Sequence, residues 1–406
     1  MQELALELLG LSLMLLVGEV LGDLTERQGY GRLTGVMLGG LIMGPFALGG
    51  LINDLFKVKL IYLGSDIMFL SELSVIFLVF ASGLEHGVAP LRRAGAWGVM
   101  GATMGALAPF LLTLGARGLL GLDLNASLIV GTAVAPTSLA AVSGLIMEEG
   151  GGGRWTDMLI SASAMDDVVS LILLSVALGL SQAKFVGALG MVRVVVFYSV
   201  SWAIIFFLSV KLVPIIVSRV SRRYLFEFSL VMLFGIIAVM EALGFSPIIA
   251  AFIAGVSLAE FSGSSALQEY SRSLLLVFGS IFFVVVGAEV NLTAVGLLGL
   301  LTAVALTALA LLGKFIGVFP FSYAFTRRHD EATAVSLGME SRGEVGLSVA
   351  LTALQAGIID ERCYGSLTVA LILTTIIGVA AFSYYIRARR ALTYPAPAVP
   401  PASSPR

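Results

Sequence analysis

Two adjacent aspartates, Asp166 and Asp167, lie in the middle of the apolar run 161–170. Carboxylates inside a membrane are costly, so they usually serve a function or are paired. Two neighbouring carboxylates resist being ionised together, which allows one of them to exchange a proton for a cation. Successive residues of a helix point about 100° apart, so one carboxylate can face a cavity while the other faces a neighbouring helix. The pair predicts a binding site for cations and protons.

Lys314 lies in a second apolar run, residues 311–317, and is the natural partner for one of the two aspartates. A buried ammonium group is tolerated when a carboxylate pairs with it and is costly alone. The alternative is that Lys314 reaches out to the membrane surface, because its run ends a few turns further on.

A proline followed by two hydroxyl residues interrupts the run that precedes the aspartates: Pro136, Thr137 and Ser138. Proline removes one hydrogen bond from a helix. In lipid, the freed backbone groups must be satisfied by protein or by a watery cavity. Because hard cations prefer oxygen ligands, the hydroxyls beside this break predict an oxygen-lined ion site.

Three charged residues lie within 338–346, inside the longer apolar segment 331–357, namely Glu340, Arg342 and Glu344. Gly343 lies between the last two and indicates a second helix break. Two broken helices at matching positions would point their half-helix dipoles at each other. Arg342 and Glu344 are then expected to neutralise the helix ends, or alternatively to form a salt bridge that supports the fold.

The composition is that of a membrane protein. Of the 406 residues, 58% are hydrophobic and 12% charged, and mean hydropathy is +1.01. A soluble domain carries roughly twice that charged fraction. Apolar runs of about 20 residues, the length that crosses a bilayer, predict an all-α polytopic protein with about 13 transmembrane helices. The expected spans are 3–21, 33–52, 67–87, 95–117, 124–146, 157–180, 186–216, 225–244, 247–262, 273–291, 295–325, 331–357 and 363–386.

Other function classes are disfavoured by the same composition. A net charge of −2 does not suggest nucleic acid as a partner. The single cysteine, Cys363, excludes an internal disulfide and a thiolate metal site. The two histidines, His86 and His329, are too few for a zinc site. We expect no cofactor.

Basic residues predict how the chain lies in the membrane. With the N-terminus outside, fifteen of the 24 basic residues fall in cytoplasmic segments, five in outer loops and four within spans. The positive-inside rule therefore places the C-terminus in the cytoplasm. We expect a multi-pass protein of the cell inner membrane that contacts lipid.

The odd number of spans suggests two halves of opposite orientation. We expect a first repeat over about 1–182, a linker helix over about 183–218 and a second repeat over about 225–386. Such inverted repeats place the binding site near the midplane, where the halves meet. The transmembrane domain would cover 1–386, and 387–406 would form a disordered cytoplasmic tail.

The residues above, taken together, resemble the monovalent cation:proton antiporter-2 family, and within it the electrogenic sodium/proton antiporters with paired aspartates. Single motifs are unspecific, but their joint order and spacing are highly specific. The matching pieces are 80–85, 135–138, 166–167, 247–255, 282–287, Lys314 and 341–346.

The resemblance implies an ion-carrying core domain with crossed discontinuous helices, which moves against a dimerisation domain to give alternating access. It implies a homodimer that exchanges Na⁺, and also Li⁺, for H⁺. Asp167 corresponds to the ion and proton carrier, and Asp166 to the residue that pairs with Lys314. Thr137 and Ser138 fall at the helix crossing near the ion.

Two residues depart from the family pattern. Ser341 stands where proline is frequent, and Glu340 stands where an apolar residue is frequent. Glu340 is expected to add an accessory acid that faces the cytoplasm.

Two other functions are alternatives for this sequence. A K⁺/H⁺ antiporter of the same family is the first, although such systems often carry a nucleotide-binding domain and lack paired aspartates. An intramembrane aspartyl hydrolase is the second. Its chemistry needs two aspartates on different helices that meet across a water, whereas Asp166 and Asp167 are adjacent on one helix.

Overall fold

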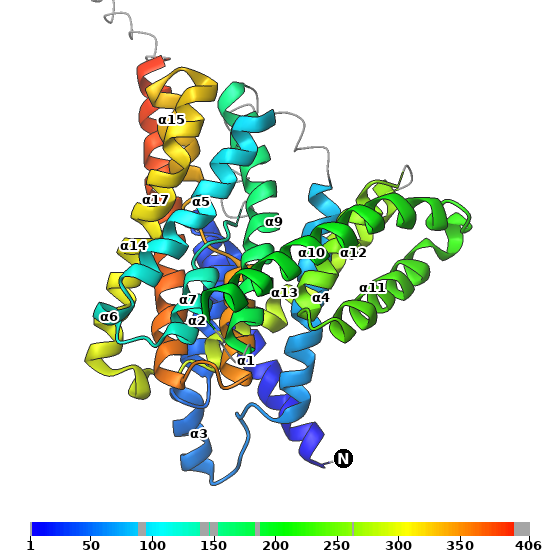
Figure 1. The fold of residues 1–406 in the computed structure, drawn as a ribbon. Helices are drawn as coiled ribbons and strands as arrows, with labels where there is room; N and C mark the ends of the chain where they lie inside the picture. The colour runs from blue at the N-terminus through cyan, green and yellow to red at the C-terminus, as the bar shows by residue number, and fades with distance from the viewer. Residues whose placement is uncertain are drawn as a thin grey trace, which may run out of the picture.

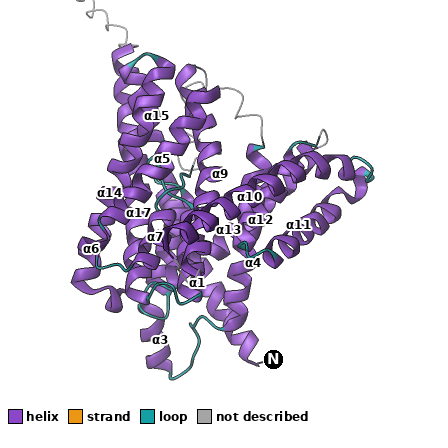
Figure 2. Cartoon of the chain, in the orientation of Figure 1, coloured by secondary structure: helices purple, strands orange, loops and turns teal. Residues whose placement is uncertain are grey.

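The computed structural model describes residues 2–87, 95–138, 146, 153–182, 187–261 and 264–393. This part of the chain is helical throughout and contains no strand (Figure 2). The all-α prediction is therefore confirmed.

The first half of the chain forms eight of the helices drawn in Figure 1. They are α1 (Gln2–Arg27), α2 (Arg32–Met43), α3 (Leu48–Phe56), α4 (Ser65–His86), α5 (Gly95–Gly115), α6 (Arg117–Leu120), α7 (Leu124–Ala133) and α9 (Arg154–Gln182).

The second half begins with a long helix and continues to the end of the described chain. Its elements are α10 (Gly187–Val217), the short 3-10 helix η2 (Arg222–Tyr224), α11 (Leu225–Ala242), α12 (Pro247–Ala259), α13 (Ser264–Ala288), α14 (Leu292–Thr326), α15 (His329–Gly338), α16 (Glu344–Gln355) and α17 (Glu361–Thr393).

Ten helical segments of the described chain are long and apolar enough to cross a membrane, with α2 and α3 counted as one. Three shorter apolar helices, α7, α12 and α16, lie within the remaining predicted spans. The thirteen predicted spans thus correspond to ten long segments and three short ones. The predicted disordered tail, 387–406, was wrong for its first residues, because α17 continues as a helix to Thr393. Residues 394–406 lie outside the described residues.

The helices pack as two groups (Figure 1). One group, which we call the core bundle, consists of α5, α7, α9, α14, α15, α16 and α17. The other, the scaffold bundle, consists of α1, α2, α4, α11, α12 and α13. Helix α10 packs against α9 on one side and α12 on the other, so it links the two bundles.

Close glycine contacts hold the scaffold bundle together in two matching places. Where α12 crosses α4, a Cβ on Gly255 would lie 2.1 Å from Phe80 O, and one on Gly83 would lie 2.6 Å from Phe252 O. Only glycine permits this approach of two backbones.

The same arrangement recurs where α2 crosses α13. A Cβ on Gly40 would lie 2.0 Å from Val284 O, and one on Gly287 would lie 2.0 Å from Met37 O. In all four cases the carbonyl that a glycine approaches belongs to the residue three positions before the glycine of the opposite helix. Each contact joins the second span of one expected repeat, α2 or α12, to the third span of the other, α13 or α4, as a two-fold relation between the repeats requires. The repeat boundaries themselves stay a prediction.

Both predicted helix breaks are present. Helix α7 ends at Ala133, and residues 339–343 separate α15 from α16. The two interrupted stretches touch, because Ser138 N–H donates to Ser341 O at 2.9 Å and Ser341 Oγ donates to Ser138 O at 2.7 Å. Unpaired backbone groups at one break are thus satisfied by the other, which is how non-helical chain is tolerated at this depth.

Candidate functional site

A fully buried ion pair joins α9 to α14. The Lys314 Nζ lies 2.8 Å and 2.7 Å from the two carboxylate oxygens of Asp166, and neither side chain is exposed to solvent. The Lys314 ammonium also donates to Ala135 O at 2.7 Å, in the stretch that follows α7. Lys314 therefore does not reach the membrane surface, and its charge is balanced inside the core bundle.

Asp167 points elsewhere. It lines a cavity of about 560 Å³ and is only 5% exposed. The described residues offer no hydrogen bond to its Oδ1 atom, whereas the Ser82 hydroxyl bonds to the carboxylate. A buried carboxylate oxygen without a partner is costly unless something else binds there. The different surroundings of Asp166 and Asp167 follow from the angle between successive helix positions.

The cavity lies between the two bundles. The scaffold bundle contributes residues from α1, the α1–α2 turn, α2, α4 and α13, among them Glu26, Ser82 and Arg272. The core bundle contributes Asp167 and Glu344 together with the hydroxyls named below. The acidic and hydroxyl groups that line the cavity can attract and hold a cation.

Thr137 and Ser138 line the same cavity. The Thr137 hydroxyl donates to Met339 O at 3.0 Å, which ties the first break to the second. Because the hydrogen is used, its oxygen lone pairs remain available to a cation. Pro136 lies in the non-helical stretch between α7 and these residues, as its sequence position indicated.

Arg342 lies at the second break and is 3% exposed. Its guanidinium donates to Met339 O, Glu340 O and Ala310 O at 3.0–3.1 Å. The first two carbonyls follow the C-terminal end of α15, where positive charge is favourable. Glu344 begins α16, where negative charge is favourable. Both residues are placed to offset half-helix dipoles.

Glu340 differs from the prediction. We expected this acid to face the cytoplasm, but its side chain is 3% exposed and does not line the cavity. The non-helical chain at the break places Glu340 against α17, where a Cβ on Gly378 would lie 2.8 Å from the Glu340 Cβ. Its Oε2 atom has no hydrogen-bond partner among the described residues.

Sequence reasoning assigned no role to two cavity hydroxyls, Ser82 and Ser163. Ser163 precedes Asp167 by four residues, so helical spacing alone places both on one face of α9. Ser82 had no such signal. It lies in one of the matching motifs, 80–85, but comes from the other bundle, and only tertiary packing brings it to Asp167.

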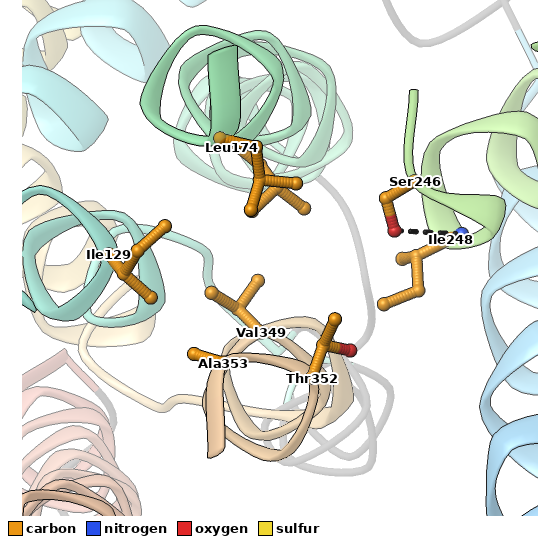
Figure 3. A pocket seen from close by; sticks show the side chains of 8 residues that line it. Ile129, Leu174, Ser246, Ile248, Val349, Thr352 and Ala353 are labelled. Atoms are coloured by element: carbon orange, nitrogen blue, oxygen red, sulfur yellow. Dashed lines mark hydrogen bonds between the residues drawn. The ribbon is translucent and has the colours of Figure 1, made fainter. Parts of the chain in front are cut away.

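A much smaller space lies on the other side of the helix crossing. It has a volume of about 10 Å³, about the size of one water molecule. Figure 3 shows apolar side chains of α7, α9 and α16 meeting the start of α12 around it, including Ile129, Leu174, Val349 and Ile248. The contact between the bundles is thus closed here, whereas it opens into the large cavity at Asp167.

Comparison with known proteins agrees with these features. A family model described as "Sodium/hydrogen exchanger, transmembrane" matches residues 11–386. The chain belongs to this family. It is therefore a membrane transporter, and the monovalent cation:proton antiporter resemblance is confirmed at this level.

Curated relatives cover almost the whole chain. A Na⁺/H⁺ antiporter of Enterococcus hirae is 25% identical over 390 residues, 94% of this chain and 99% of the relative. The Na⁺/H⁺-K⁺ antiporter GerN of Bacillus cereus is 26% identical over 388 residues, 93% of this chain and 96% of the relative.

A solved structure shows the same fold. The sodium proton antiporter MjNhaP1 of Methanocaldococcus jannaschii matches with a TM-score of 0.70 at 18% identity. The match covers 92% of this chain and 95% of that protein. At this identity the likeness concerns the fold alone.

Proposed function

We propose that this transporter exchanges Na⁺, and also Li⁺, for H⁺, with Asp167 as the ion and proton carrier. The observation that carries the proposal is the Oδ1 atom of Asp167, a residue that lines the large cavity; this atom has no hydrogen-bond partner in the part of the chain that the structure describes. Asp166 lies beside it and is already neutralised by Lys314, so the site as a whole can accept one further cation. The names of the curated relatives support Na⁺ as the ion.

The neighbouring groups suggest how the ions compete. Na⁺ would bind the Asp167 carboxylate, with the Thr137 and Ser138 oxygens of the cavity lining close by. Asp166, the preceding residue on α9, would supply a second carboxylate. As Na⁺ binds, Asp167 would give up its proton. The cation beside Asp166 would also weaken the attraction that holds the Lys314 ammonium, so Lys314 would release a second proton. Proton return to Lys314 and Asp167 would restore the ion pair and expel Na⁺. The same group of side chains thus binds either Na⁺ or protons.

Transport further requires that the site open to each side in turn. Arg32 and Arg272 line the cavity, and the basic-residue distribution assigns both residues to the cytoplasmic side. The apolar contact of Figure 3 closes the opposite side. We infer that this is the cytoplasm-facing state, and that movement of the core bundle against the scaffold bundle produces the other.

We also propose that the protein lies in the cell inner membrane as a homodimer, with its N-terminus outside and its C-terminus in the cytoplasm. The large apolar side chains exposed along α10, among them Val196, Phe207 and Leu212, suit contact with lipid or with a second copy. Cross-linking in native membranes, followed by sizing of the purified protein, tests the dimer.

The function is tested with purified protein in vesicles that carry a pH gradient and a pH-sensitive dye. Na⁺, Li⁺, K⁺ or choline is added in turn. We expect Na⁺ and Li⁺ to collapse the gradient in the wild type and not in the variant Asp167→Asn. Full exchange by that variant would refute the role of Asp167.

The second candidate is K⁺/H⁺ exchange, favoured by the K⁺ in the name of the Bacillus cereus relative. Collapse of the gradient by K⁺ alone would select it. The aspartyl hydrolase alternative loses its support, because the family match identifies a transporter.

A further inference from the structure

A fully buried tyrosine makes a hydrogen bond from one bundle to the other. Tyr364, at the start of α17 in the core bundle, donates its hydroxyl to Val286 O at 2.9 Å. Val286 lies in the last turn of α13, in the scaffold bundle. If the bundles move against each other, this bond has to stretch or break.

The acceptor is a carbonyl that its own helix leaves unpaired. The regular helical donor for Val286 O is the amide of Val290, four residues on. That amide donates instead to Gly287 O at 3.2 Å, while the Glu289 amide still reaches Val285 O at 2.9 Å. A buried carbonyl at a helix end needs a donor, and Tyr364 supplies it.

The carbonyl of Val286 has a second possible hydrogen-bond donor. If the Tyr364 hydroxyl withdraws, a small rotation of the Val290 amide returns it to Val286 O and adds one regular helical bond. The end of α13 can therefore satisfy the same carbonyl in two ways, with or without the core bundle.

Both partners are fixed within their own bundles. Gly287, next to Val286, packs directly on the backbone of α2, where a Cβ would lie 2.0 Å from Met37 O. Tyr364 is held on α17, which packs along α14. The bond therefore joins a residue that packs within the scaffold bundle to a residue that packs within the core bundle.

The bond lies on the closed side of the protein. The end of α13 and the start of α17 lie on the same side of the membrane as the start of α12 and the ends of α9 and α16, because successive spans alternate in direction. Those segments form the closed contact of Figure 3.

We propose that the Tyr364 hydroxyl is a tie between the bundles that stabilises the state with the cavity open and the opposite side closed. It is a positioning residue, which sets the ratio of the two transport states and touches no ion. The inference rests on the alternating access proposed above.

The test measures the two states by cysteine labelling. Cys363, the single cysteine, is first replaced by serine. One reporter is Ser280→Cys in the large cavity, and the other is Thr352→Cys in the small space of Figure 3. A small membrane-impermeant thiol reagent is applied to everted vesicles for the first reporter and to right-side-out vesicles for the second.

Tyr364→Phe removes one oxygen and keeps the ring, so packing is retained. We expect labelling to fall at Ser280→Cys and to rise at Thr352→Cys, with the ratio of the two states shifted about fivefold, the size that one buried hydrogen bond produces. Melting curves check that each variant is folded.

The matched control is Tyr385→Phe on the same helix. Tyr385 also donates to a backbone carbonyl, Asp330 O at 3.1 Å, but both residues belong to the core bundle. That variant should leave both labelling rates unchanged. Equal rates in Tyr364→Phe and Tyr385→Phe, or a shift in the opposite direction, would overturn the proposal. Absence of ion exchange by the wild-type protein in the vesicle assay would instead count against the proposed function. The labelling result would still stand, because labelling does not depend on transport.

Discussion

The buried pair of Lys314 and Asp166 makes a stability prediction that depends on the balance of charge. Lys314→Met replaces the ammonium by an apolar group of similar length. Asp166 then keeps a carboxylate that is fully buried and has lost a cation 2.7–2.8 Å away. Removing one partner of such a pair costs about 3–5 kcal/mol, because the remaining charge is uncompensated. Removing both partners in favour of uncharged groups of similar size is about neutral.

We therefore expect the free energy of unfolding to fall by about 3 kcal/mol or more in Lys314→Met, and to recover largely in the double variant Asp166→Asn/Lys314→Met. The assay is thermal melting of the purified proteins at pH 8 in choline buffer without Na⁺. Lys211→Met is the control, because Lys211 is exposed on α10 and its loss should change stability little.

Sodium provides a second readout in the same assay. A cation that binds beside Asp166 can replace the missing ammonium, so added Na⁺ should raise the melting temperature of Lys314→Met more than that of the wild type. Two results would refute the reasoning. One is a Lys314→Met variant with the same melting temperature as the wild type. The other is a double variant Asp166→Asn/Lys314→Met that is no more stable than Lys314→Met.

The remaining predictions concern the cavity and the scaffold. Ser82→Ala removes the hydroxyl bonded to Asp167, and since a hydrogen bond to a charged group contributes about 1.5–3 kcal/mol, KM for Na⁺ in everted vesicles should rise about tenfold or more. An unchanged KM would exclude Ser82 from the site. Gly255→Ala places a Cβ 2.1 Å from Phe80 O, so α12 and α4 must separate, and the free energy of unfolding should fall by about 1–3 kcal/mol. Equal melting of Gly255→Ala and the wild type would show that this contact is not tight.

Local features of the sequence were sufficient to predict the helical framework. Apolar runs of the length of a membrane span predicted the helices, because only a helix satisfies its own backbone in lipid. The same reasoning predicted both breaks, since Pro136 cannot continue a helix and Gly343 stands among charges that need compensation. Apolar runs also identified the charged site residues Asp166, Asp167 and Lys314, because a charge inside a membrane span is costly and is usually functional or paired.

Only the tertiary structure decided which groups meet. Helical geometry separates the directions of Asp166 and Asp167 but does not say which neighbour each one finds. The buried position of Glu340 depends on the path of a non-helical stretch of five residues, which no helical period governs. The contacts of Ser82 with Asp167 and of Tyr364 with Val286 join different bundles. Sequence periodicity describes neighbours along one helix, whereas contacts between helices far apart in the chain are set by how whole bundles pack.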